Sequence, residues 1–159
     1  MLTALLGEQL DPTQGGLALG IDAAPCMIKV AARKRGTQTV QFQTAIAEDL
    51  PFPEASFDHA CSAFFFHHVD YELKLAALRE LRRVLRPGGC LAIIDVDTPT
   101  SLYGKVAMRA GEWLFKQPEI GENRRGLFRP ALTGVGCRKW QAVDHWQGYI
   151  TLFRWDSIE

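Results

Sequence analysis

The chain has 159 residues, of which 47% are hydrophobic and 23% are charged, and its 18 Lys and Arg residues balance its 18 Asp and Glu residues. This length allows one domain with a buried core. The charge balance argues against a nucleic-acid partner, and no apolar stretch is long enough to span a membrane. We therefore expect neither nucleic acid nor a membrane as a partner. The N-terminus also lacks the basic region of a secretory signal.

The cysteines are scattered along the chain and contain no Cys-x-x-Cys pair: Cys26, Cys61, Cys90 and Cys137. Three of them lie in or beside apolar runs, so we expect buried, reduced thiols. Reduced thiols are typical of proteins in a reducing compartment, and a cytoplasmic location is expected.

Apolar periodicity and turn residues predict alternating strands and helices over the first two thirds of the chain. Helices are predicted over residues 2–10, 25–35 and 71–85. Strands are predicted over residues 17–21, 40–46, 57–66 and 90–96, and the last is nearly continuously apolar, as in a strand covered on both faces. This alternation predicts an α/β fold with a mostly parallel sheet and helices on both faces.

The pattern changes beyond Asp97. Residues 101–116 have the spacing of a helix with one apolar face, formed by Leu102, Val106, Ala110, Trp113 and Leu114. Residues 118–129 are polar and charged and are expected to form a mobile loop, followed by a short helix over residues 129–135. Strands over residues 139–144 and 147–153 are expected to form an antiparallel pair at one edge of the sheet.

Acidic residues follow several of the predicted strands, and ligands of an open parallel sheet bind beyond the carboxyl ends of its strands. Asp22 is the first candidate, because a carboxylate can accept hydrogen bonds from both hydroxyls of a ribose; capping of the following helix is the alternative. Asp49, next to Glu48, is suited to accept a hydrogen bond from an adenine amino group, with a solvated turn as the alternative. Asp95 and Asp97 lie at the end of the last predicted strand.

Four segments resemble motifs of class I S-adenosylmethionine-dependent methyltransferases, in the order and at the spacing of that family. They cover about half of the chain and read GIDAAPCMI at residues 20–28, AEDLPF at 47–52, FDHA running to FHHV at 57–69, and LRELRRVLRPGG at 78–89. The resemblance is closest to the branch that acts on small molecules, including the quinone-biosynthesis type.

The resemblance implies one Rossmann-like domain over residues 1–159, in which residues 101–132 form the variable substrate or lid segment. It implies S-adenosyl-L-methionine as cofactor and an unidentified small molecule as methyl acceptor, with carbon, oxygen and nitrogen all open as the accepting atom. Whether the protein forms a homodimer stays an open question. The residues implied to bind the cofactor are Asp22, Ala23, Met27, Glu48, Asp49, Leu50, Ala63 and His67.

The chain departs from the family at its N-terminus. Members carry a first strand and a Gly-x-Gly-x-Gly loop before the helix that residues 2–10 resemble, and this sequence contains neither. We therefore expect an N-terminally truncated fold, either a fragment or a diverged relative. Direct pairing of residues 17–21 with residues 57–63 is the favoured arrangement, and a partner chain or another segment that fills the gap between these strands is the alternative. Cofactor binding should be weak, because glycine lets the backbone approach the methionine end of the cofactor.

No catalytic residue is assigned, and His67 and Asp95 are the candidates. Methyl transfer from a sulfonium depends mostly on positioning and desolvation, and a base is needed only where the acceptor loses a proton. Neighbouring His67 and His68 are not expected to share a metal, and His145 is interpreted as an ordinary strand residue. A non-catalytic methyltransferase-like domain and a dinucleotide-binding oxidoreductase domain remain alternatives.

Overall fold

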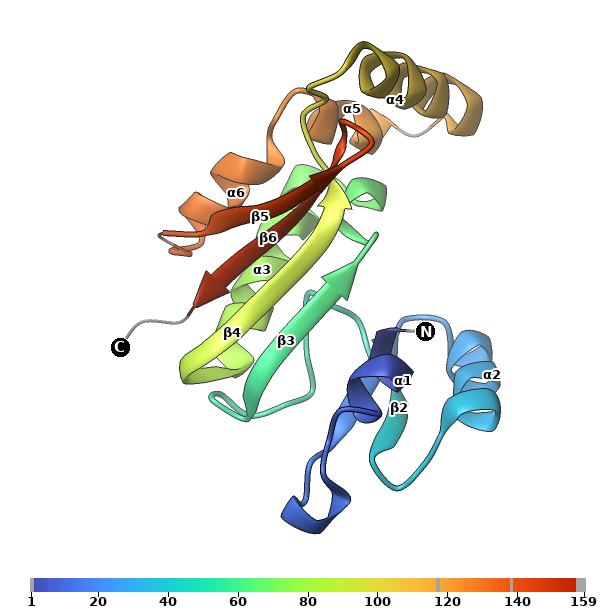
Figure 1. The fold of residues 1–159 in the computed structure, drawn as a ribbon, viewed down its shortest axis with the longest axis vertical. Coiled ribbons are helices and arrows are strands. Elements are labelled where there is room, and N and C mark those ends of the chain that lie inside the picture. Colours follow the sequence, from blue (N-terminus) through green and yellow to red (C-terminus); the bar gives the residue numbers. More distant parts are fainter. Residues whose placement is uncertain (1, 117, 138, 157–159) are drawn as a thin grey trace. The chain divides into compact units, whose positions relative to one another are not determined.

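The computed structural model describes residues 2–116, 118–137 and 139–156 (Figure 1). The chain divides into two compact units, unit 1 over Met1–Pro51 and unit 2 over Phe52–Glu159, and each is described by itself. Within the described residues, no helix is both long and apolar enough to cross a membrane.

Unit 1 is a small α/β layer built on two parallel strands. Its elements are α1 (Leu2–Gly7), the 3-10 turn η1 (Pro12–Gln14), β1 (Ala18–Asp22), α2 (Pro25–Arg35) and β2 (Val40–Thr44). Asp22 at the end of β1 lies beside Thr44 at the end of β2. A Cβ atom on Gly7 would lie only 2.1 Å from the Val40 side chain, so a glycine is needed where α1 packs against β2.

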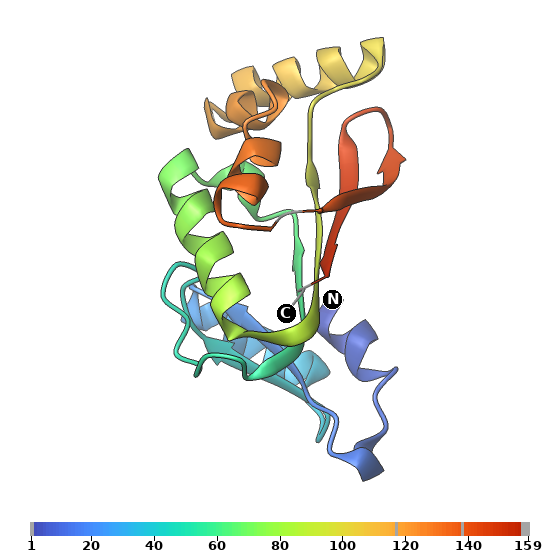
Figure 2. The same ribbon diagram turned by 90° about the vertical axis from the view of Figure 1, so that its left-hand side faces the viewer.

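Unit 2 contains a four-stranded sheet in the order β3-β4-β6-β5. Strands β3 and β4 are parallel, whereas β6 is antiparallel to both β4 and β5. Helices α3 and α6 lie on the same face of this sheet (Figure 2), and α4 and α5 lie beyond the carboxyl end of β4 (Figure 1). The elements are β3 (Phe57–Ala63), η2 (Phe66–His68), α3 (Tyr71–Val84), β4 (Leu85–Val96), α4 (Leu102–Phe115), α5 (Pro118–Arg124), α6 (Phe128–Gly134), β5 (Gln141–Trp146) and β6 (Ile150–Asp156).

The core of unit 2 is a chain of aromatic rings that joins η2, α6 and β6. The Phe66 and Phe128 ring centroids are 5.0 Å apart, and those of Phe128 and Phe153 are 5.2 Å apart. Helix α3 contributes Leu78, which is fully buried. Such ring contacts add to the stabilisation from burial of apolar area, so they hold the turn after β3 against the sheet.

The α/β class, the parallel strand pairs and the antiparallel C-terminal pair are confirmed. Within unit 1, β1 pairs with β2, and within unit 2, β3 pairs with β4. The expected direct pairing of residues 17–21 with residues 57–63 would join the two units and stays a prediction. Strand β4 also starts at Leu85, earlier than expected. Its pairing with β3 shifts register between Phe57 and His59, and Gly88, with φ of 78°, allows the intervening excursion of the backbone.

Residues 118–129, expected as a loop, instead contain α5 and the start of α6. Two buried polar groups hold α5 against the rest of unit 2. The Lys74 ammonium, which is fully buried, donates to Glu122 Oε2 at 2.7 Å, and Asn123 Nδ2 donates to the Val96 carbonyl at 2.8 Å. Tertiary contacts of this kind override the polar composition that predicted a loop.

The expectation that the cysteines are buried is mostly wrong. Cys26 and Cys61 are exposed and Cys90 is half-buried, whereas Cys137 is fully buried. Burial raises the pKa of the Cys137 thiol to about 11.

We predict that Cys137 is the last cysteine to react with a thiol reagent. The thiolate is the reactive form, and at pH 8 a thiol with this pKa is ionised to only about one part in a thousand. Mass spectrometry of the folded chain treated with iodoacetamide should show Cys26 modified first and Cys137 modified only after denaturation. Modification of Cys137 at the rate of Cys26 would contradict its burial.

Candidate functional site

The carboxyl end of β3 leads into a strained turn. Phe64, directly after β3, has φ of 55°, a left-handed conformation that is uncommon for a bulky residue, and its N–H donates to the Ile94 carbonyl at 2.9 Å. Strain of this kind persists only where the surrounding structure enforces it, and it is concentrated at functional sites. The turn delivers His67, on η2, to the end of β4.

His67 and Asp95 form a hydrogen-bonded pair at this edge of the sheet. Asp95 is fully buried, and His67 Nδ1 lies 2.8 Å from Asp95 Oδ1. The Asp95 carboxylate also accepts the backbone N–H groups of Phe66 and Val96, both at 2.7 Å. With the carboxylate ionised, Nδ1 carries the ring proton, and Nε2 is then the unprotonated nitrogen of the neutral imidazole.

A cavity of about 240 Å³ adjoins this pair. Its lining is mostly apolar and comes from η2, the end of β4, α4, α5 and the β5–β6 turn: His67, His68, Val96, Ala107, Met108, Gly111, Ile120 and Tyr149. The His67 and His68 rings are in contact, with centroids 3.9 Å apart and ring planes tilted by 41°. The arrangement is an apolar cavity with an imidazole in its wall, a combination typical of small-molecule sites.

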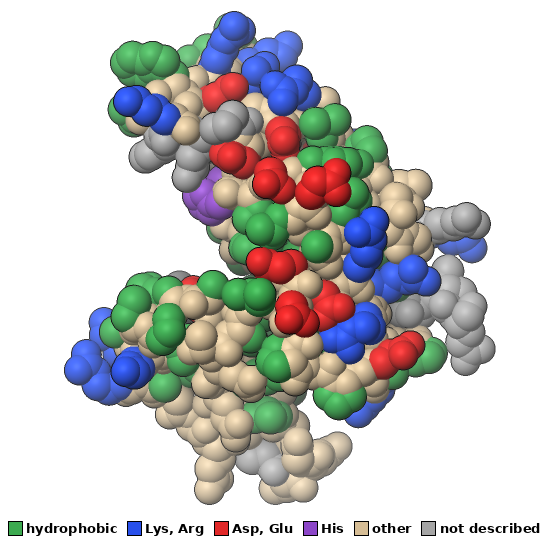
Figure 3. Space-filling view, turned by 180° about the vertical axis from the view of Figure 1, so that it is seen from behind, with side chains coloured by type: hydrophobic (Ala, Val, Ile, Leu, Met, Phe, Trp, Pro, Cys, Tyr) green, Lys and Arg blue, Asp and Glu red, His purple; other side chains and the backbone are tan. Residues whose placement is uncertain are grey.

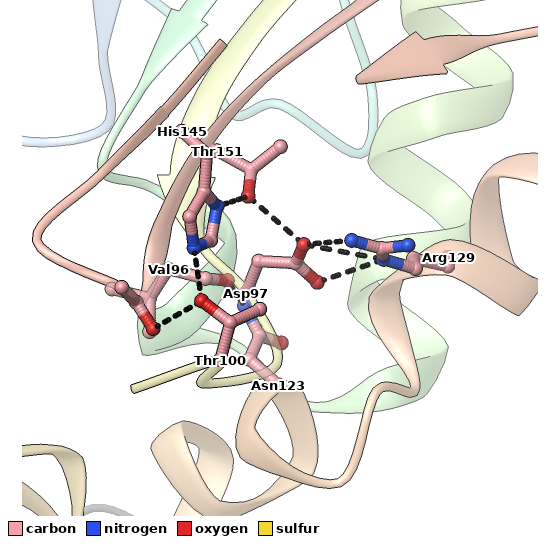
Figure 4. A network of polar contacts seen from close by, with 8 residues as sticks. Val96, Asp97, Thr100, Asn123, Arg129, His145 and Thr151 are labelled. Atoms are coloured by element: carbon pink, nitrogen blue, oxygen red, sulfur yellow. Dashed lines mark hydrogen bonds and ion pairs between the residues drawn. The ribbon is translucent and has the colours of Figure 1, made fainter. Parts of the chain in front are cut away.

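A second network of polar groups surrounds Asp97, one residue past β4 (Figure 4). The buried Asp97 carboxylate accepts hydrogen bonds from Arg129 Nη2 at 2.6 Å and from the Thr151 hydroxyl at 2.9 Å. Hydrogen bonding to Asp97 raises the pKa of the Arg129 guanidinium. The His145 ring bridges two hydroxyl groups: Nδ1 lies 2.7 Å from Thr151 Oγ1, and Nε2 lies 3.0 Å from Thr100 Oγ1. The network therefore ties α6 and the segment before α4 to the end of the sheet.

In unit 1, candidate residues lie at the carboxyl ends of β1 and β2. Asp22 Oδ1 accepts the Ala24 N–H at 2.8 Å, which closes the turn before α2, and the Asp22 side chain is exposed. The N–H of Ala45, after β2, donates to the Asp22 carbonyl at 3.2 Å. Asp49 is exposed and pairs with Ile46 across a β-bridge, and the remaining candidates nearby are Ala23, Met27, Glu48 and Leu50.

The structure thus brings together the two candidate catalytic residues, His67 and Asp95. Ala63 ends β3 and is exposed, a few residues before His67. Sequence reasoning missed the polar network, because Arg129 was placed at the junction of a loop and a short helix and His145 was interpreted as an ordinary strand residue. Only Asp97 carried a signal, its position at a strand end. Among the described residues, no cluster of His, Cys, Asp and Glu side chains has the makings of a metal site.

A comparison with protein families adds the decisive observation. The family described as "Methyltransferase domain" matches residues 3–93, more than half of the chain. The chain belongs to this family. The match covers unit 1 and extends through β3 and α3 into β4, so it includes His67 and ends two residues before Asp95.

Curated relatives match over a similar part of the chain. A demethylmenaquinone methyltransferase of Thermus thermophilus is 44% identical over 89 residues, which cover 54% of this chain and 39% of the relative. The uncharacterized methyltransferase YcgJ of Bacillus subtilis is 38% identical over 84 residues, covering 51% of this chain and 32% of that protein. The chain thus matches less than half the length of these relatives.

Solved structures share the fold at low sequence identity. The CurJ carbon methyltransferase superposes with a TM-score of 0.72 at 19% identity, covering 99% of this chain and 45% of that chain. The PH0226 protein of Pyrococcus horikoshii has a TM-score of 0.65 at 17% identity, covering 92% and 74%. At these identities the likeness concerns the fold alone.

We predict that Asp97→Asn lowers the free energy of unfolding by about 2–3 kcal/mol, because it removes a buried charge partner of Arg129 and weakens the acceptor of Thr151. Asp156→Asn is the matched control: its carboxylate is exposed and pairs with exposed Arg154 at 3.0 Å. Urea denaturation should separate the two variants. An equal stability for both would show that the Asp97 network does not support the fold.

Proposed function

We propose that this protein transfers a methyl group from S-adenosylmethionine to a small organic acceptor. The observation that carries the proposal is the His67–Asp95 pair in the wall of an apolar cavity, in a chain that belongs to the methyltransferase-domain family. The family match argues against a dinucleotide-binding oxidoreductase. We further propose that residues 1–159 act as one methyltransferase-like domain in the cytoplasm.

The residues of unit 1 fit the adenosine half of the cofactor. Asp22 presents an exposed carboxylate whose orientation is set by the Ala24 N–H, which suits two ribose hydroxyls. Asp49 and Glu48 follow β2 and are suited to the adenine, with Ala23, Met27 and Leu50 as apolar surroundings. The family resemblance, and not the geometry, carries the proposal that Ala63 and His67 also contact the cofactor.

The bound cofactor supplies a methyl group on a good leaving group, so this chain has to orient the acceptor and exclude water. The apolar cavity lining does both. Where the acceptor loses a proton, the neutral imidazole of His67 accepts it at Nε2. Asp95 holds the ring in place by accepting a hydrogen bond from Nδ1–H. His67 is thus the proposed general base and Asp95 its positioning residue.

The acceptor class we favour is a hydroxylated aromatic ring. The relatives named above include a demethylmenaquinone methyltransferase, and the cavity is lined by Met108, Ile120 and the Tyr149 ring. Because α4 and α5 contribute to this lining, residues 101–132 are proposed to form the substrate segment. Carbon, oxygen and nitrogen remain to be distinguished as accepting atoms by analysis of the product.

We predict that His67→Gln lowers kcat by about 10²–10⁴-fold in an assay of labelled-methyl transfer from S-adenosylmethionine to a reduced demethylmenaquinone. The exposed strand residue His59 provides the matched control, His59→Gln, which should retain activity. Circular dichroism of both variants establishes that they are folded. Full activity of His67→Gln would remove the general base from the mechanism, and no transfer by the unmodified chain to any quinol would favour a non-catalytic domain.

We also predict that the 159-residue chain binds the cofactor weakly, on the order of a hundredfold more weakly than a chain with a glycine loop. The reason is that residues 1–159 contain no Gly-x-Gly-x-Gly loop to donate several backbone hydrogen bonds to the methionine end of the cofactor. Asp22→Ala should weaken cofactor binding about tenfold further through loss of charge-assisted bonds to the ribose. Asp11→Ala removes another exposed turn carboxylate of unit 1 and should change nothing. NMR titration with S-adenosylhomocysteine measures all three. Low-micromolar binding, or equal affinities for Asp22→Ala and the unmodified chain, would contradict the assignment.

A further inference from the structure

Helix α4 has a large apolar face that is mostly exposed in the described part of the chain. The side chains of Leu102 and Trp113 are 80% and 79% exposed, and those of Leu114, Val106 and Tyr103 are 65%, 62% and 61% exposed. Leu102, Val106 and Trp113 recur at the spacing of one helix face. Soluble proteins rarely leave so many large apolar side chains together in water, and such a patch marks an interaction surface.

The packing of α4 shows why this face points outward. The inner side of the helix consists of small residues and one methionine at positions i, i+3, i+4 and i+7: Gly104, Ala107, Met108 and Gly111. A Cβ atom on Gly104 would lie 2.6 Å from the Gly148 carbonyl oxygen, so the β5–β6 turn approaches this side closely. Ala107, Met108 and Gly111 line the cavity beside His67. The bulky apolar residues are therefore free for another partner.

Basic residues accompany the apolar face. Lys105 and Arg109 are exposed and lie one turn apart on the same helix, and exposed Lys116 directly follows its last residue. Lys105 and Arg109 also line a hollow of about 370 Å³, together with Arg124, which pairs with Glu112 at 3.2 Å. In Figure 3, Lys and Arg side chains gather beside hydrophobic ones at the end of unit 2 that carries α4 and α5. The helix therefore combines a broad apolar face with a positive flank.

We propose that α4 docks this protein on the surface of a membrane that contains anionic phospholipids. Leu102, Val106 and Trp113 would enter the boundary between headgroups and acyl chains, and Lys105 and Arg109 would contact lipid phosphates. An amphipathic helix with basic residues on its polar side and aromatic residues on its apolar side binds in this way. Trp and Tyr side chains are also favoured at such interfaces.

The charge distribution favours lipid over a second copy of the chain. A two-fold contact between two α4 helices would bring the Lys105 and Arg109 side chains of both copies to one interface, where like charges repel. An anionic bilayer instead neutralises them. The expectation that no membrane is involved rested on the length of apolar stretches, and a helix that lies flat in the interface needs no membrane-spanning length.

Docking by α4 does not depend on the proposed methyl transfer. If that function is right, the helix has an added role, because its inner face lines the cavity beside His67 while its outer face contacts lipid. A hydrophobic acceptor dissolved in the bilayer would then reach the cavity past a single helix. Only this last step rests on the proposed function.

Flotation of the full chain with vesicles tests the docking without cofactor or acceptor. We expect binding at least about tenfold tighter to vesicles with about 30% phosphatidylglycerol than to pure phosphatidylcholine. The double variant Val106→Glu/Trp113→Glu should bind about tenfold more weakly. Val143→Glu/Trp146→Glu is the matched control, because it makes the same changes at exposed positions of β5 and should bind like the unmodified chain. Lys105→Glu/Arg109→Glu should lose the preference for anionic vesicles.

Three results would overturn the proposal. The first is that the unmodified chain does not bind the vesicles, and the second is that the α4 and β5 variants lose vesicle binding equally. The third is a dimer in sedimentation velocity that Val106→Glu/Trp113→Glu dissociates, which would assign the face to a second copy of the chain. Because vesicle binding is measured without methyl transfer, a failure here leaves the proposed function to its own tests, and an inactive chain that still floats with anionic vesicles leaves the docking intact.

Discussion

Two carboxylates without solvent exposure, Asp95 and Asp97, determine how unit 2 is built around the end of β4. A buried charge is costly unless hydrogen-bond donors surround it, so each carboxylate requires partners from elsewhere in the chain. Asp95 receives its donors from η2, which places His67, and Asp97 receives them from Arg129 on α6 and Thr151 on β6. The candidate base and the anchoring of the segment after β4 therefore have the same physical origin.

Sequence periodicity predicted most elements, because their cores follow simple rules. The range 25–35 matches α2, and residues 101–116 contain α4 with Ser101 as its cap, whose hydroxyl accepts the Gly104 N–H at 2.9 Å. Helix α5 was missed because its stability comes from tertiary contacts of Glu122 and Asn123, which no local pattern reveals.

The candidate site was predictable to the extent that it follows strand ends. Asp95 was named from its position at the end of a predicted strand and His67 from the family resemblance, and the structure joins them at 2.8 Å. Arg129 and Thr151 were not predicted as members of the site, because an arginine that pairs with an acid 32 positions away leaves no spacing signal. The residues assigned to the adenosine half lie at one edge of the β1–β2 pair, as parallel strands require, and their role in binding stays a prediction.

Helix α4 shows where periodicity can mislead about burial. Leu102, Val106 and Trp113 mark the most apolar side of the helix, and a sequence argument would place that side in a core. The structure instead packs the side with Gly104 and Gly111, because a helix with small residues can approach a neighbouring turn closely enough to close a cavity. Large apolar residues on the opposite side make no contribution to that packing, and in water they lower solubility. Their presence is explained by an apolar phase outside the protein, and the basic side chains beside them are the feature that distinguishes an anionic bilayer from a second protein surface.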